Sequence, residues 1–216
     1  MSGHVPESLR ERKKRATREA IAHTARRLFA ARGFDAVTVA EVADAAGVSE
    51  KTVFNHFATK EDLVFAGGDT GTARLLAAIA ERPPGSSVLD VFRASTEEML
   101  DVVAAGETEE SLVVPRIVRN SPHLQQRLAA GWEREAEAIA AAFAEATGAD
   151  ADDLVPAVVA RTLAWTLITV FRATFAGLLA GEEPAALAAR MRPRAAQAYD
   201  QLAEGLAGYG VARAAS

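Results

Sequence analysis

The side chains best suited to specific hydrogen bonding lie in one short segment that begins at Ser49. Lys51 and Thr52 stand together, and Asn55 follows one helical turn later. A helix in the DNA major groove presents such side chains to base edges, where lysine donates to guanine and asparagine pairs with adenine. Glu50, beside them, either accepts from cytosine or only interacts with the helix dipole. The spacing therefore indicates a candidate base-contacting helix.

The sequence indicates that this segment is the second of two short helices. Thr38-Val-Ala-Glu41 is a capping-box pattern that predicts the start of the first helix. Gly47 fits a turn position that favours positive φ, and Ser49 can cap the second helix. Because Ala43 is small, the two helices can cross closely, so the sequence predicts a helix-turn-helix. A generic helical hairpin remains the alternative for this pattern alone.

A wider string of residues favours the first interpretation. The chain contains Phe34-x-x-x-Thr38-Val39-x-x-Val42-Ala43-x-x-Ala46-Gly47-Val48-Ser49-x-x-Thr52-Val53-Phe54-x-His56-Phe57-x-x-Lys60-Glu61-x-Leu63. This string resembles the TetR family of transcriptional regulators, and the resemblance covers residues 15–65. It implies an all-α protein with an N-terminal three-helix helix-turn-helix DNA-binding domain. We expect that domain, with its basic N-terminal arm, at 1–66 and a larger helical ligand-binding and dimerisation domain at 67–216.

The resemblance also implies DNA contacts for individual residues. In the family, the positions that match Thr38, Thr52, Phe54, His56 and Lys60 usually contact DNA or its phosphates. Structural alternatives stay open: Thr38 and Ser49 as helix caps, Phe54 as a core residue in place of a tyrosine. The predicted DNA-binding residues are Arg15, Thr38, Ser49, Glu50, Lys51, Thr52, Phe54, Asn55, His56 and Lys60.

Charge is distributed unevenly along the chain. The net charge of −5 is the sum of +2 in residues 1–66 and −7 in the remainder. Nine basic residues fall within Arg10–Arg32, against only Glu11 and Glu19. Such a run by itself is typical of a solvated tail, but beside a DNA-binding motif it predicts an arm, Arg10–Arg18, that contacts phosphates or the minor groove.

Catalytic and metal-binding patterns are missing from the sequence. The chain has no cysteine, which excludes disulfides, thiolate nucleophiles and cysteine zinc sites. Its four histidines, His4, His23, His56 and His123, form no local metal-ligand pair. We therefore expect no cofactor, no metal and no enzymatic activity. The basic N-terminus lacks the apolar region of a secretion signal, so a cytoplasmic location is expected.

The remainder of the chain keeps a helical pattern without strand-like alternation. Gly67, Gly68 and Gly71 fall where the family has its connecting helix, and they indicate either a hinge or a simple helix break. In the family the last two long helices commonly form a four-helix bundle with those of a second copy. The pattern predicts helices near 16–32, 60–82, 88–105, 109–119, 122–147, 153–180 and 184–207.

The segment 153–180 is apolar nearly all round, so it must be buried in its domain, in a dimer interface, or in both. Arg161 and Arg172 interrupt it and argue against a membrane span. Both arginines share a stripe with Trp165 and Ile168. They indicate either salt bridges or a pocket for a ligand with an acidic or phosphate-bearing group.

The candidate ligand-binding residues follow from this stripe and from apolar residues elsewhere, for each of which a plain core position is the alternative. The stretch Arg116–Arg127 also loosely resembles family members with acyl-CoA-like ligands. The candidates are Phe92, Met99, Arg116, Trp132, Arg161, Trp165, Ile168 and Arg172, with Phe171 and Phe175 as further apolar lining.

The function that these expectations imply is a homodimeric transcriptional repressor. A largely apolar small molecule, with or without an anionic group, would release it from a pseudo-palindromic operator in double-stranded DNA. One alternative is a DNA-binding factor without a small ligand, which predicts a filled core in the second domain. Another is a helical-bundle enzyme, although the second domain offers only one histidine, His123.

Overall fold

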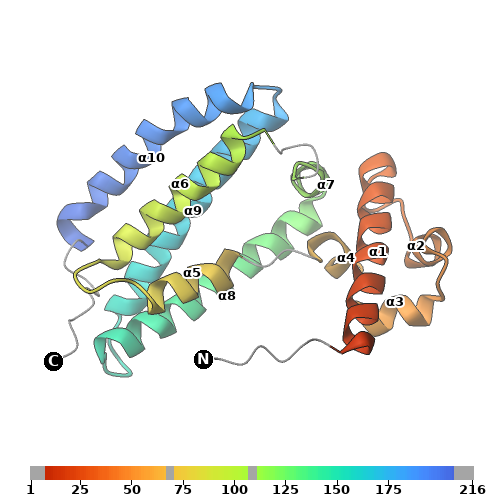
Figure 1. Ribbon diagram of the computed structural model, residues 1–216, viewed down its shortest axis with the longest axis horizontal. Coiled ribbons are helices and arrows are strands. Elements are labelled where there is room, and N and C mark those ends of the chain that lie inside the picture. The colour runs from red at the N-terminus through yellow and green to blue at the C-terminus, as the bar shows by residue number, and fades with distance from the viewer. Residues whose placement is uncertain (1–7, 67–70, 107–110, 207–216) are drawn as a thin grey trace. The chain divides into compact units, whose positions relative to one another are not determined.

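The computed structural model describes residues 8–66, 71–106 and 111–206, and every regular element within them is an α-helix (Figure 1). The all-α prediction is confirmed. The chain divides into two compact units. The N-terminal unit comprises residues 1–68 and 113–127, and the C-terminal unit comprises 69–112 and 128–216. The segment 113–127 thus groups with the first unit, although a single boundary after residue 66 was expected.

The N-terminal unit is built around the long helix α1 (Leu9–Arg32). Helices α2 (Val39–Ala46) and α4 (Asp62–Phe65) pack on α1, and so does α7 (Val113–Arg119), while α3 (Glu50–His56) packs on α2 (Figure 1). The first residues of α8 (Pro122–Thr147) complete the unit. Its buried side chains include Ile21, Ala25, Phe29, Phe34, Val37, Val42, Val53, Phe57, Leu63, Ile117 and Leu124.

The ends of α2 and the start of α3 follow from local capping. The Thr38 hydroxyl accepts from the Glu41 N–H, and the Glu41 carboxylate accepts from the Thr38 N–H, as the capping-box pattern predicts. Gly47 adopts the left-handed conformation, with φ of 67°, that ends α2. Ser49 then caps α3 by accepting from the Thr52 N–H. The helix-turn-helix is present as predicted.

Helix α1 begins earlier than the sequence pattern indicated. Its first residue is Leu9, whereas the expected start lay at Ala16. The cause is a second capping box, in which Ser8 and Glu11 exchange hydrogen bonds between side chain and backbone. The residues from Arg10 to Arg18 are therefore the first turns of a helix and not a separate extended arm.

The single helix expected over 60–82 is two helices in the structure. Helix α4 ends at Phe65 with Ala66 in an extended conformation, and α5 (Gly71–Ala80) begins afterwards. Gly67 and Gly68 lie outside the described residues, so the hinge alternative stays untested. The extended backbone at Ala66 accounts for the end of α4 without them.

The C-terminal unit contains α5, α6 (Val88–Ala104), most of α8, α9 (Val155–Leu179) and α10 (Pro184–Leu206). Helix α6 packs on both α9 and α10 (Figure 1). Its Thr96 hydroxyl lies 2.8 Å from the hydroxyl of Tyr199 on α10, and both side chains are buried. Burial raises the pKa of Tyr199, so this hydroxyl stays protonated at neutral pH.

Helix α9 is long and apolar enough to cross a membrane by length and composition alone. The core helix of a globular domain has the same features. Val159, Leu163 and Ile168 of α9 are buried in the C-terminal unit. The polar interruption at Arg161 is matched by Glu133 of α8, whose carboxylate accepts from Nε at 2.8 Å. Helix α9 is therefore a core helix of this unit, with part of its surface exposed.

Candidate nucleic-acid interface and ligand cavity

Helix α3 presents the residues expected to contact bases on its exposed side. Glu50, Lys51 and Asn55 are exposed, whereas Val53 between them is buried in the core of the unit. The Thr52 hydroxyl lies 2.8 Å from that of Ser49, so Thr52 is half-buried and partly occupied with the helix cap. The helix thus keeps a donor, an acceptor and an amide available along one surface.

Thr38 and Ser49 act as helix caps and remain exposed. Capping alone accounts for both residue types, because each hydroxyl accepts a backbone N–H of the first helical turn. A phosphate contact would be an additional role. It stays a prediction for both residues.

Phe54 is not a core residue, which was the structural alternative for this position. Its side chain is 52% exposed, while Val53 and Phe57 on either side are buried. An aromatic ring left in solvent beside Lys51 and Asn55 has no packing role that explains it. Its position on α3 keeps the predicted DNA contact open.

Arg18 connects α1 to the end of α3. Its guanidinium lies 4.2 Å from the centre of the Phe57 ring and donates to the backbone carbonyl of His56. Lys60 makes a similar contact, with Nζ 4.3 Å from the centre of the Phe34 ring. Both cations therefore have roles in packing. Lys60 is half-buried, and its contact with DNA stays a prediction.

His56 lies within the influence of two cations of α1, Lys14 and Arg18. Its Nδ1 atom is buried and has no hydrogen-bond partner among the described residues. Burial, together with the charges of Lys14 and Arg18, lowers the pKa of His56. The imidazole is consequently neutral at physiological pH and would contact DNA as a hydrogen-bonding group, not as a cation.

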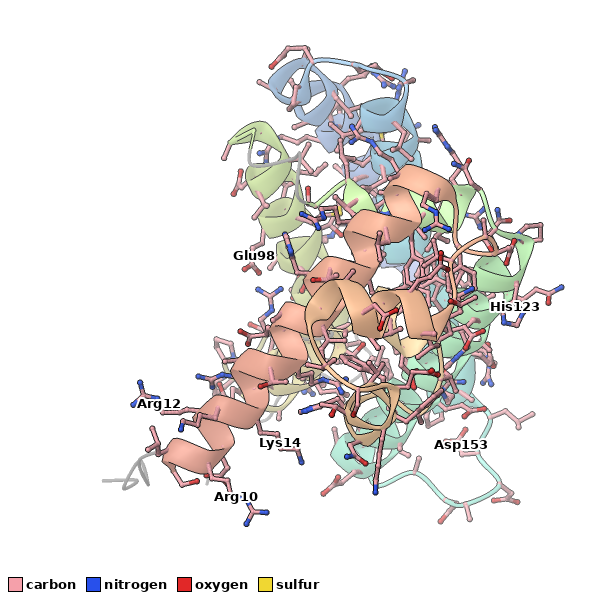
Figure 2. All side chains as sticks on the ribbon, turned by 90° about the vertical axis from the view of Figure 1, so that its right-hand side faces the viewer. Arg10, Arg12, Lys14, Glu98, His123 and Asp153 are labelled. Atoms are coloured by element: carbon pink, nitrogen blue, oxygen red, sulfur yellow. The ribbon has the colours of Figure 1, made fainter. Side chains whose placement is uncertain are left out.

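The early turns of α1 carry the densest positive charge of the N-terminal unit. Figure 2 shows the side chains of Arg10, Arg12 and Lys14 extending away from this helix. Arg15 lies 3.7 Å from Glu19 in an exposed i, i+4 pair. A helical array of exposed cations suits the closely spaced phosphates of a DNA backbone.

The start of α8 makes a connection that the sequence pattern did not reveal. His123 Nε2 lies 2.7 Å from the Glu61 carboxylate, and Arg127 donates to Asp62 at 3.3 Å. The His123 ring also stacks on Phe34, with 6.5 Å between ring centres. More than 60 residues separate the partners, so local residue spacing could not predict these contacts.

The C-terminal unit contains a partly open cavity of about 470 Å³. Its lining comes from α5, α6, α8 and α9, with Ser111 from outside these helices, and is largely aliphatic and aromatic. The size and apolar character are those of a small-molecule site. Within the described residues no group of histidine, aspartate and glutamate side chains could hold a metal ion. The lining includes Leu75, Met99, Val103, Trp132, Ile139, Leu167, Ile168, Phe171 and Phe175.

The candidate ligand-binding residues divide into two groups. Met99, Trp132 and Ile168 line the cavity, as do Phe171 and Phe175. The other candidates are not among the described residues of the lining. Phe92 is fully buried in the core, Trp165 meets the edge of Trp132, and Arg161 pairs with Glu133.

Two further arginine candidates also lie away from this lining. Arg172 is an exposed residue of α9, and Arg116 belongs to α7 in the N-terminal unit. The salt-bridge interpretation thus holds for Arg161. The segment 116–127, on which the acyl-CoA likeness rests, lies in the N-terminal unit and contributes no described lining residue.

Comparison with known proteins identifies the family. Residues 21–66 match the family model described as bacterial regulatory proteins, tetR family. The transcriptional regulator TcmR of Streptomyces glaucescens is 31% identical over 67% of this chain and 66% of its own length. The transcriptional repressor Rv1474c of Mycobacterium tuberculosis is 32% identical over 81% of this chain and 88% of its own.

A solved structure of similar fold covers nearly the whole chain. The SmeT–triclosan complex superposes with a TM-score of 0.57 at 20% identity and covers 93% of this chain and 96% of that one. The curated relatives are regulators, and the family is not enzymatic. The helix-turn-helix geometry, the family model and the length of the match to Rv1474c agree: this chain belongs to the TetR family of DNA-binding transcriptional regulators.

Proposed function

We propose that the protein is a homodimeric repressor that a small, largely apolar molecule releases from a pseudo-palindromic operator. The observation that carries the DNA-binding part is the exposed set Glu50, Lys51 and Asn55 on a capped helix, next to the cationic start of α1. Base contacts from α3 would specify the sequence, and phosphate contacts from α1 would fix the register. A repressor of this kind works in the cytoplasm, without a membrane.

The cavity supports the ligand-responsive part of the proposal. A DNA-binding factor without a small ligand would have a filled core in its C-terminal unit, and a partly open cavity of about 470 Å³ between its helices favours the ligand-responsive alternative. A ligand that prefers one conformation would lower DNA affinity by the coupling free energy between the two sites. The solved structure of SmeT, which has a similar fold, is a complex with triclosan.

The lining supports a largely apolar ligand but gives no support for an anionic group. That expectation rested on Arg161 and Arg172. The first is paired with Glu133, with Nη2 2.5 Å from the carboxylate, and neither is among the described lining residues. We therefore retain the apolar character alone.

The dimer part rests on the exposed surface of α9. Val155, Val158 and Trp165 are exposed there although they are large and apolar. Helix α10 also carries exposed alanines, including Ala185, Ala189 and Ala196, which allow close approach of a second helix. One helix-turn-helix contacts few base pairs, whereas two placed about 34–36 Å apart contact successive turns of the groove.

Selection of bound DNA from a random pool tests the proposal. We expect enrichment of a pseudo-palindromic sequence, and weaker binding to it when a metabolite extract is added. Lys51→Ala should change the base preference at one position in each half-site. Lys14→Ala, a matched loss of charge on α1, should lower affinity for all sequences and reduce the salt slope by about 1. Recovery of no palindromic sequence would contradict the proposal.

A further inference from the structure

Among the charged side chains that line the cavity, carboxylates outnumber cations. Arg74 of α5 lies 3.6 Å from the Glu98 carboxylate of α6, and these two charges largely offset each other. Glu135 of α8 is half-buried in the same lining and has no ion pair among the described residues. An uncompensated carboxylate in a mostly apolar cavity favours a positively charged partner.

Aromatic residues line the same cavity as Glu135. Trp132 precedes Glu135 by three residues on α8, so the two share one surface of the helix. Phe171 and Phe175 of α9 line the cavity with ring centres 4.3 Å apart. The faces of aromatic rings attract cations, and most strongly where water is scarce. Rings and carboxylate therefore select for the same sign of charge.

A second hollow adjoins the cavity and is also acidic. It has a volume of about 500 Å³ and shares Ala78, Ser95 and Glu98 with the cavity lining. Glu81 and Asp90 add two more carboxylates to this hollow, against the single guanidinium of Arg82. Because carboxylates outnumber cations at this approach, the local potential draws cations inward and repels anions.

We propose that the ligand of this cavity is an amphipathic organic cation. Its apolar body lies against the aliphatic and aromatic lining, and its positive group lies beside Glu135, reached through the adjoining hollow. This inference rests on the proposed ligand-binding function of the cavity and names the chemical class of the ligand.

A matched set of three dansyl probes tests the inference on the full-length protein. The probes share one linker and differ only in the end group: trimethylammonium, its uncharged tert-butyl isostere, or carboxylate. Both tryptophans, Trp132 and Trp165, lie in the C-terminal unit, so energy transfer to dansyl reports binding there. We expect the trimethylammonium probe to bind about tenfold tighter than the tert-butyl probe, with the carboxylate probe weakest.

Three substitutions separate charge recognition from folding. Glu135→Gln should weaken the trimethylammonium probe about tenfold and leave the tert-butyl probe unchanged. Arg74→Gln should have the opposite sign and tighten the cation severalfold, because it leaves the Glu98 charge uncompensated. Glu137→Gln removes an exposed carboxylate of the same helix that is not in the described lining, and should leave all three affinities unchanged.

The outcomes distinguish the class of ligand from the existence of the site. Equal binding of the cation and its isostere, or tightest binding of the carboxylate probe, overturns the cationic class but leaves a working cavity. Binding of none of the three probes also overturns the inference. The DNA selection experiment is independent of these probes, so its palindromic product would still support the regulator in either case.

Discussion

At the scale of single residues, Arg18 joins two helices that must keep a fixed geometry for DNA recognition. Its guanidinium covers the Phe57 ring and donates to the His56 carbonyl. Arg18→Met keeps the apolar stem but removes both interactions, and we expect a loss of about 1–2 kcal/mol in the free energy of unfolding. Urea unfolding measures this loss. Arg12→Met, at an exposed position of the same helix, is the control, and an equal effect of both would contradict the assignment.

Glu41 provides a pH-dependent contribution to the start of α2. Hydrogen bonds from the Thr38 backbone, from Arg32 and from the Thr38 hydroxyl lower the pKa of Glu41 from 4.5 to about 2. Because the folded pKa lies below the unfolded one, the stabilisation is present above pH 4.5 and is lost as the pH falls towards 2. The difference in urea midpoint between wild type and Glu41→Gln should therefore shrink across this range. A difference that stays constant would contradict the assignment.

The predictions made from the sequence agree with the structure where local chemistry determines the position of a residue. Caps at Thr38 and Ser49 and the turn at Gly47 are set within four residues, so the exposed surface of α3 was predictable. The cavity lining was not predictable, because residue spacing shows which side chains share one face of a helix but not which other helices that face meets. Arg161 and Ile168 share that stripe, yet one forms a surface ion pair and the other lines the cavity.

At the scale of elements, two helical glycines have opposite surroundings. A methyl group on Gly177 of α9 would lie 2.8 Å from the buried Leu187 of α10 and from the Glu182 carboxylate. Gly131 of α8 has only the end of Arg134 nearby, at 3.8 Å. Gly177→Ala should therefore destabilise the protein by about 1–3 kcal/mol, because the buried Leu187 side chain must leave its packed position or α9 and α10 must move apart.

Gly131→Ala is the matched control for this prediction and should change stability in the other direction. It adds helix propensity without a clash, so we expect a gain of about 0.5–1 kcal/mol. Thermal unfolding of both variants measures the two signs in one experiment. If both alanines stabilise the protein, then the close approach of α9 and α10 at Gly177 is not a tight contact in solution.

Element boundaries were predicted well where a cap or breaker is strong. Helix α8 begins at Pro122 after Ser121, whose hydroxyl accepts from the Leu124 N–H, and its bounds agree with the expected 122–147. The start of α1 was missed because the Ser8–Glu11 box stands within a run of charges that resembles a solvated tail. The helix expected over 60–82 is divided into α4 and α5, and the division falls where Gly67, Gly68 and Gly71 indicated either a hinge or a helix break.

At the scale of the whole molecule, the net charge of −5 conceals two regions of opposite sign. Residues 1–66 carry +2 and the remainder −7, so the acidic remainder should itself be repelled by DNA. Composition could predict this division. It could not predict that Val113–Arg127 belongs to the N-terminal unit, because that assignment depends on tertiary contacts such as those of Arg127 with Asp62.

The proposed function requires a dimer for operator recognition, and α9 is the element that tests this requirement. The hydroxyls of Thr162 and Thr169 donate to carbonyls of their own helix, so these residues can present methyl groups along the same face of α9 as Val158, which is 61% exposed. Val158→Glu would bury a charge in an apolar interface, which is costly without a partner. We expect this variant to sediment as a monomer and to lose affinity for the palindrome while retaining its helical content.

Ala138→Glu adds the same charge at an exposed position of α8 and should leave the dimer intact. Sedimentation velocity of the free proteins and of their DNA complexes compares wild type with both variants. A wild-type protein that is monomeric both free and on DNA would contradict the dimer, and so would a Val158→Glu variant that remains dimeric. Loss of the dimer in Val158→Glu alone would place the two-fold interface on α9, because the two variants differ only in where the charge is added.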